Sequence, residues 1–218
     1  MIKPCLVILI LAYSGNLLAQ HSDTVHMNKG TVVLSAYDDD RLIKEGDSLV
    51  DLNKTHEAIA KYNSVIELSP TNKKALSRRA FAYLQMNDYR HALQDYDQVI
   101  RLDSMDFRNL SNRALVKWYM KNYKGAITDC DKAIKLNEKY AYAYFHKGIS
   151  EFELHKYKEA IVCYDQAIQL DPSFTRAFYN RGNSKFELND QGGACADWTQ
   201  AKSQGHDMSG TMLQKYCK

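Results

Sequence analysis

The sequence of 218 residues lacks a concentration of charge of either sign. Acidic and basic residues are interleaved along the chain, and the formal net charge is only +3. A nucleic-acid-binding protein needs a clustered basic face that displaces the counterions of the phosphates. We therefore expect no nucleic-acid partner.

Motifs for metal binding and catalysis are also missing. None of the five cysteines belongs to a Cys-x-x-Cys pair, and no His-x-x-x-His lies near them, so the sequence predicts no zinc site. It has no nucleophile elbow, no phosphate-binding glycine loop and no His-Glu-x-x-His. The acidic run at residues 38–40 suggests a metal site, but it is better explained as negative charge at a helix start. We expect no catalytic residue, no metal and no cofactor.

Long apolar runs are scarce. An unbroken apolar stretch, residues 6–12, follows Lys3 and is too short to span a bilayer, and small and polar residues then lead to Ala19. This order is typical of a secretory signal peptide, here residues 1–19. The prediction is an exported protein, periplasmic or secreted, with no membrane insertion after cleavage and a flexible tail over residues 20–38. The alternative is an uncleaved membrane anchor.

The sequence does have an internal period of 34 residues. Five segments follow one another without insertion: 39–72, 73–106, 107–140, 141–174 and 175–208. Each has a small residue at its eighth place: Gly46, Ala80, Ala114, Gly148 and Gly182. Each has alanine at its twentieth place: Ala58, Ala92, Ala126, Ala160 and Ala194. The twenty-fourth place is large or flexible and apolar: Tyr62, Tyr96, Cys130, Tyr164 and Trp198.

Each 34-residue segment is predicted to form a helical hairpin. Apolar residues recur at steps of three and four in each half, as in residues 160–170, which makes one face of a helix. A short polar turn such as Asn87-Asp88 separates the halves. One hairpin cannot bury its apolar face alone, so neighbouring hairpins must stack. The sequence therefore predicts an all-α solenoid of five helical hairpins.

This pattern resembles the tetratricopeptide repeat, a 34-residue unit with the same series of small, alanine, aromatic and small positions. The resemblance covers Asp39 to about Met208. It implies a right-handed α-solenoid whose degenerate fifth repeat is covered by a C-terminal capping helix at residues 209–218. The first repeat departs from the pattern at Leu42, where the family prefers an aromatic residue.

In that family, the first helix of each hairpin lines a concave groove that binds protein or peptide. Carried over to this sequence, the groove residues are Lys74, Arg78, Phe81, Arg108, Asn112, Tyr119, Tyr142, Phe145, His146, Arg176, Tyr179, Asn180 and Asn183. This mixture of aromatic, amide and basic side chains suits a partner segment with acidic and apolar residues. The family's clamp for a terminal carboxylate is incomplete here, because Lys44 stands where its asparagine is required.

Cys195 and Cys217 are expected to form a disulfide that ties the fifth hairpin to the cap. Cys195 directly follows the small residue of a second helix, Cys217 ends an amphipathic stretch, and an exported chain meets an oxidising compartment. The alternative is two buried free thiols. Cys130 and Cys163 are interpreted as small core residues.

The expected function is that of a non-enzymatic scaffold that holds a protein or peptide segment in its groove, in the cell envelope. Two alternatives remain open. One is a structural adaptor of an envelope complex that acts through its convex face or its cap. The other is a hydrolase with an unrecognised site, although an open solenoid offers no enclosed pocket of converging titratable groups.

Overall fold

The computed structural model describes residues 25–27, 30–32 and 36–217. The chain divides into two compact units, Met1–Asp39 and Asp40–Lys218. The predicted signal peptide, residues 1–19, lies outside the described residues. In the described part of the chain, no helix is long and apolar enough to cross a membrane.

The first unit contains a short antiparallel hairpin of strands β1 (Val25–Met27) and β2 (Gly30–Val32), with Val25 opposite Val32. β-Branched residues such as these favour strands. Helix α1 then begins at Ala36. The predicted tail, residues 20–38, overlaps this hairpin and the start of α1, and its flexibility stays a prediction.

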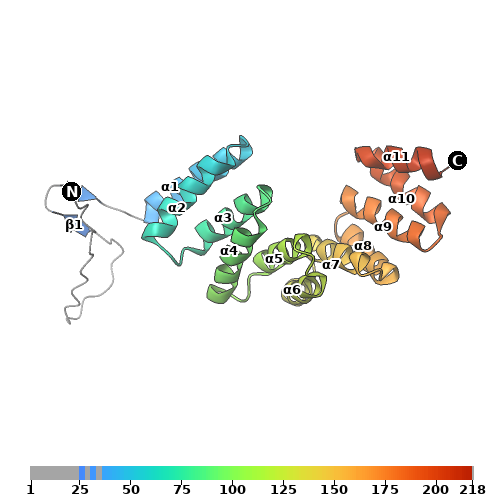
Figure 1. The fold of residues 1–218 in the computed structure, drawn as a ribbon, viewed down its shortest axis with the longest axis horizontal. Coiled ribbons are helices and arrows are strands. Elements are labelled where there is room, and N and C mark those ends of the chain that lie inside the picture. The colour runs from blue at the N-terminus through green and yellow to red at the C-terminus, as the bar shows by residue number, and fades with distance from the viewer. Residues whose placement is uncertain (1–24, 28–29, 33–35, 218) are drawn as a thin grey trace. The chain divides into compact units, whose positions relative to one another are not determined.

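The second unit is a right-handed α-solenoid of five helical hairpins with a capping helix (Figure 1). The first helices of the hairpins are α1 (Ala36–Asp51), α3 (Lys73–Gln85), α5 (Phe107–Tyr119), α7 (Ala141–Glu153) and α9 (Thr175–Glu187). The second helices are α2 (Thr55–Leu68), α4 (Tyr89–Leu102), α6 (Tyr123–Leu136), α8 (Tyr157–Leu170) and α10 (Gln191–Ser203). The cap is α11 (Asp207–Tyr216), which starts inside the segment assigned to the fifth repeat.

The helix ends repeat with the same period. Asn72, Asp88, Asp106, Asn122 and Asp190 cap the following helices, each accepting a backbone N–H with its side chain. The fifteenth place of every repeat has positive φ: Asn53, Asn87, Lys121, His155 and Asn189. This left-handed residue ends each first helix, and the next N–H bonds back across the turn, as from Asp88 N to Tyr83 O at 2.9 Å.

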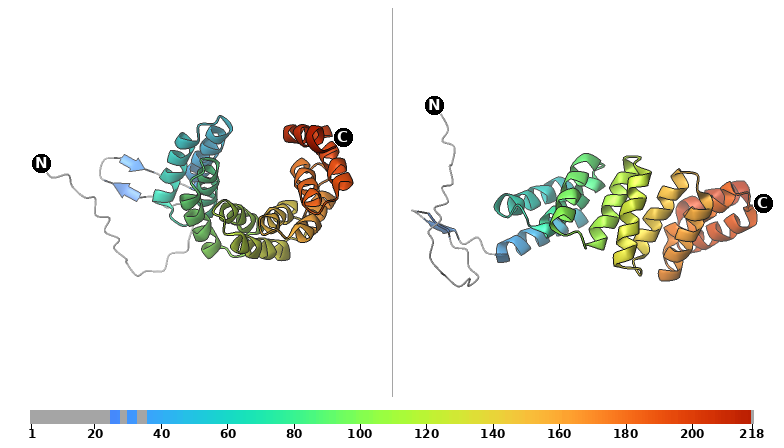
Figure 2. Two further views of the ribbon diagram at one scale, coloured as in Figure 1. Left: turned by 45° about the vertical axis from the view of Figure 1, so that its right-hand side comes forward. Right: turned by 90° about the horizontal axis from the view of Figure 1, so that it is seen from below.

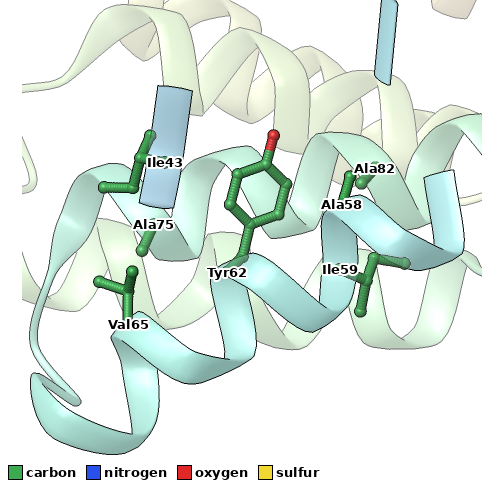
Figure 3. Packing of buried hydrophobic residues seen from close by; sticks show 7 residues of the cluster. All are labelled: Ile43, Ala58, Ile59, Tyr62, Val65, Ala75 and Ala82. Carbon is green, nitrogen blue, oxygen red and sulfur yellow. The ribbon is translucent and has the colours of Figure 1, made fainter. Parts of the chain in front are cut away.

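The core is built from a small residue on each first helix opposite a large one on the second. A Cβ added to Gly46 would lie 2.5 Å from Tyr62 Cε1, and one added to Gly148 would lie 2.6 Å from Tyr164 Cε1. Tyr62 stands between the two helices of the first hairpin, among the buried residues shown in Figure 3. The repeated spacing of small and aromatic residues therefore has a steric cause: the aromatic ring of the second helix fits only against a small residue on the first.

A ladder of ion pairs joins the hairpins, and it was not predicted from the repeat pattern. Arg79, Arg113 and Arg181 occupy the seventh place, and each makes a bidentate contact with the aspartate sixteen residues later: Asp95, Asp129 and Asp197. The third nitrogen of each arginine reaches the preceding hairpin, at Asn63, Asp97 or Asp165. In the fourth repeat Lys147 contacts Asp131 alone, because Cys163 replaces the aspartate.

The cap is fastened covalently. Cys195 and Cys217, the pair predicted from the sequence, form a disulfide with their Cα atoms 5.8 Å apart. Tyr216 of α11 packs on Phe186, with ring centroids 4.5 Å apart, and the Gln191 side chain donates to the Tyr216 carbonyl. Cys130 and Cys163 are free and buried, and burial raises the pKa of the Cys163 thiol to about 11.

Candidate partner-binding face

The first helices form the inner face of the solenoid. Neighbouring first helices contact each other at α3–α5, α5–α7 and α7–α9, whereas no two second helices in the described chain make contacts of comparable extent. The helices of Asp40–Lys218 follow a curved path, with the first helices inside (Figure 2). We define the inner face as the second, sixth, ninth and thirteenth places of these helices.

Side-chain contacts show that the first helices run parallel and nearly in register. Lys74 Nζ lies 2.7 Å from Asp40 Oδ1, 34 residues earlier. Ser77 Oγ donates to Asn109 Oδ1 at 2.6 Å, 32 residues later. Equivalent places of neighbouring repeats therefore lie side by side, as the resemblance to the repeat family implies.

The predicted groove residues divide into three groups by burial. Seven are exposed: Lys74, Arg78, Phe81, Arg108, Tyr119, Tyr142 and Arg176. Four are half-buried: Asn112, Tyr179, Asn180 and Asn183. The remaining two, Phe145 and His146, are buried, so they belong to the core and do not lie open to a partner.

Phe145 and His146 are buried because α7 packs closely between α5 and α9. The Phe145 ring lies 4.8 Å from that of Phe174 and 6.0 Å from that of Tyr164. His146 Nδ1 lies 2.9 Å from Ser111 Oγ and 3.0 Å from the Ser111 carbonyl oxygen. Burial lowers the pKa of His146 to about 4, so it is neutral at physiological pH and links α7 to α5.

Lys74 and Arg78 are exposed but already paired. Lys74 contacts Asp40, and this hydrogen bond lowers the pKa of the Asp40 carboxyl. Arg78 Nε lies 3.2 Å from Asp47 Oδ1. The acidic residues of the first repeat thus neutralise the basic residues of the second.

Arg108 and Arg176 have no ion pair among the described residues. The guanidinium carbon of Arg108 lies 4.6 Å from the centroid of the Phe107 ring. That of Arg176 lies 5.3 Å from Phe145 and 5.7 Å from Phe174. Stacking on aromatic rings orders each guanidinium, so both can bind a carboxylate with little further loss of side-chain entropy.

The exposed aromatic side chains gather on this face too. Among the residues whose burial is described, the only phenylalanine, tyrosine or tryptophan side chains in the exposed class are Phe81, Tyr119 and Tyr142, at 40%, 44% and 44% of their full exposure. Tyr119 is stacked on Tyr89 at 4.8 Å between centroids, and Tyr142 lies 4.9 Å from Phe174. They present rigid apolar area at low entropic cost.

A pocket of about 280 Å³ opens beside Phe81, between the first two hairpins. Its walls are Asp47, Val50, Asp51, Tyr62, Arg78 and Phe81. The Tyr62 hydroxyl donates to Asp47 at 2.8 Å, and Asp51 is exposed. The described residues contain no cluster of three or more metal-ligating side chains.

Comparison with known protein families identifies the repeat. Profiles described as TPR repeat match residues 46–87 and 148–189, and profiles described as tetratricopeptide repeat match residues 74–106 and 107–140. The chain belongs to the tetratricopeptide-repeat family. A comparison with curated proteins finds no match.

Solved structures show the same fold. MamA has a TM-score of 0.64 at 22% identity, over 73% of this chain and 93% of its own. YrrB, described as a TPR protein with an unusual peptide-binding site, has a TM-score of 0.62 at 20% identity, over 80% and 90%. PilF of Pseudomonas aeruginosa has a TM-score of 0.71 at 16% identity, over 78% of each chain.

Proposed function

We propose that the protein is a non-enzymatic scaffold that binds a protein or peptide segment on its inner face. The observation that carries the proposal is the coincidence of exposed aromatic rings and unpaired arginines on this one face: Phe81, Tyr119, Tyr142, Arg108 and Arg176. Aromatic residues and arginine are the side chains that dominate binding energy at protein interfaces. The peptide-binding site named for YrrB agrees with this use of the fold.

The partner segment is expected to carry acidic and apolar residues. Arg108 and Arg176 offer paired N–H donors to carboxylates, and the three exposed rings offer apolar contact. Lys74 and Arg78 are expected to contribute less to partner binding, because they already form ion pairs with Asp40 and Asp47.

Replacing Arg108, Tyr142 and Arg176 by alanine tests the proposal. Partner binding should weaken by about 2 kcal/mol or more, roughly 30-fold, since each residue is an interface anchor of at least about 1 kcal/mol. The matched control is a triple alanine variant of Arg101, Val162 and Leu170, which are exposed on second helices. Both variants should keep the wild-type circular dichroism spectrum. If the control variant loses the partner and the inner-face variant still binds it, the proposal is contradicted. Binding through the second helices, on the outer face, is then favoured.

We place this scaffold in the cell envelope, periplasmic or secreted, on the basis of the signal-like residues 1–19. The proposal requires cleavage after Ala19. Mass spectrometry of the exported protein should give a chain that begins at Gln20. Recovery of a chain that still begins at Met1 would instead indicate the uncleaved anchor.

A further inference from the structure

The two ends of the first helices carry different charges on the inner face. The second residues of α3, α5, α7 and α9 form one rim, which we name the N-terminal rim: Lys74, Arg108, Tyr142 and Arg176. The last residues of the five first helices form the opposite rim, which we name the C-terminal rim: Asp51, Gln85, Tyr119, Glu153 and Glu187. Asp40 stands at the equivalent place of α1 and pairs with Lys74, so the positive charge of the N-terminal rim is that of Arg108 and Arg176. The C-terminal rim carries the negative charges of Asp51, Glu153 and Glu187.

This placement works against the stability of the helices. A helix carries partial positive charge at its N-terminus and partial negative charge at its C-terminus, so basic residues are unfavourable at the start and acidic residues at the end. Helices α3, α5, α7 and α9 nevertheless have no acidic residue in the first turn, and Arg108 and Arg176 stand there. Helix α1, by contrast, has the favourable Asp38 and Asp39.

The charges of the rims add to the helix dipoles. Because the first helices are parallel and in register, their positive ends lie along the N-terminal rim and their negative ends along the C-terminal rim. The face is therefore polarised across its width. Asp106 at the cap of α5 and Asp40 beside Lys74 offset part of this cost, but Arg176 and the acidic residues at the helix ends have no such offset. A local rule broken at several equivalent places is typical of a functional surface.

Lys74 is paired with Asp40, but the other charged residues of the two rims have no counter-ion among the described residues. Arg108, Arg176, Asp51, Glu153 and Glu187 form no ion pair among the described residues. The Tyr123 hydroxyl donates to Glu153 at 3.4 Å, which leaves the carboxylate charge in place. Two lysines do stand in the last turns of first helices, but Lys117 is held by Asp129 and Lys185 by Asp197.

The width of the face limits the shape of a partner. The rims are eleven residues apart along each helix, about 16 Å at the rise of an α-helix. A segment that contacts both rims and also the floor, at Phe81 and Leu115, must project side chains in three directions. An extended strand projects them in two directions only, whereas an α-helix with side chains is about 10–12 Å wide and projects them all round.

We propose that the inner face recognises an α-helical partner segment with acidic residues along one flank, basic residues along the other and an apolar stripe between them. The acidic flank contacts the N-terminal rim, the basic flank contacts the C-terminal rim, and the apolar stripe contacts Phe81 and Leu115. This inference rests on the proposed function, since it assigns the partner class of the same face.

Two synthetic peptides of identical composition test the polarity. Each is about 20 residues long, which spans several first helices at the usual spacing of packed helices. The segregated peptide has glutamates on one flank, lysines on the other and leucines between. The mixed peptide alternates glutamate and lysine within each flank. Circular dichroism establishes that their helicity is equal, and calorimetry with the full-length protein measures affinity.

The segregated peptide is expected to bind about ten-fold more tightly than the mixed one at low salt, and the difference should disappear near 1 M salt, where surface charges are screened. Equal affinity for the two peptides would contradict the proposed charge polarity of the inner face. Failure of the segregated peptide to bind would contradict it as well.

Reversal of the rims provides a second test that a folding defect cannot imitate. The pair Arg108→Glu and Arg176→Glu should weaken binding of the segregated peptide by about ten-fold. Adding Glu153→Lys and Glu187→Lys should restore it, because the polarity is then reversed and the peptide binds turned end for end. All four substitutions favour the helix dipole, so the variants should fold. A quadruple variant that binds no better than the double variant contradicts the proposal.

The alanine variant of Arg108, Tyr142 and Arg176 separates the two levels of inference. If both peptides bind wild type with equal affinity and neither binds this variant, the inner face is the binding surface but the proposed charge polarity is wrong. If this variant binds the segregated peptide as wild type does, the peptide lies elsewhere and the proposed function fails with the inference.

Discussion

Replacing Asp129 by alanine is expected to lower the free energy of unfolding by about 3–5 kcal/mol, because it removes the counter-charge of Lys117 and the bidentate partner of Arg113, which keeps only its contact with Asp97. Asp129 accepts from Arg113 Nε at 2.8 Å, Arg113 Nη2 at 2.7 Å and Lys117 Nζ at 2.7 Å. Its side chain is only 2% exposed, and those of Arg113 and Lys117 are 14% and 18% exposed. Water can therefore replace little of what the carboxylate supplies.

Asp131 provides the matched control on the same helix. Its side chain is 53% exposed and contacts one cation, Lys147 at 2.7 Å, so Asp131→Ala should cost about 1 kcal/mol or less. Urea unfolding followed by circular dichroism measures both variants, provided that the slopes of the transitions agree. Equal costs for the two substitutions would show that the ladder is not a buried network.

Loss of the disulfide between Cys195 and Cys217 is expected to cost roughly 3 kcal/mol in the terminal hairpin and cap, by the loop-closure entropy of its 22-residue separation. A terminal repeat has one neighbour only and opens most easily. The Cys195→Ala, Cys217→Ala variant should unfold first at α10 and α11, as hydrogen exchange of their amides would show. Wild type in reductant should match this variant, and the variant itself should not respond to reductant.

A count of thiols tests the bond itself. The chain from Gln20 onward contains Cys130, Cys163, Cys195 and Cys217. Under denaturing, non-reducing conditions it should show two reactive thiols, those of Cys130 and Cys163. Four reactive thiols would contradict the disulfide.

The repeat period predicted the fold well because it reports packing that each hairpin must satisfy. Gly148 and Tyr164 stand sixteen residues apart for a steric reason, and that reason is readable in the sequence. The starts of the helices at Lys73, Phe107, Ala141 and Thr175 coincide with the starts of the predicted segments.

The site was less predictable, because burial on the inner face depends on contacts between neighbouring repeats. The family pattern assigns Phe145 and His146 to the groove, but only the structure shows that Phe174 and Ser111 cover them. Pairing is similarly non-local: Lys74 meets Asp40 across 34 residues.

The acidic C-terminal rim was also not predicted, although the charged residues at the thirteenth place of the repeats indicate it. The thirteenth place contains Asp51, Glu153 and Glu187, and only Tyr119 at that place was assigned to the groove. Comparing the charge at each helix end with the helix dipole would have identified the rim.

Photo-crosslinking in the native host tests the central claim most directly. A crosslinking amino acid is placed at Tyr142 on the inner face or at Val162, which is 61% exposed on a second helix. The inner-face proposal predicts that a partner is captured from position 142 and not from position 162, and that Arg108→Ala with Arg176→Ala reduces the capture. Capture from position 162 alone would contradict it.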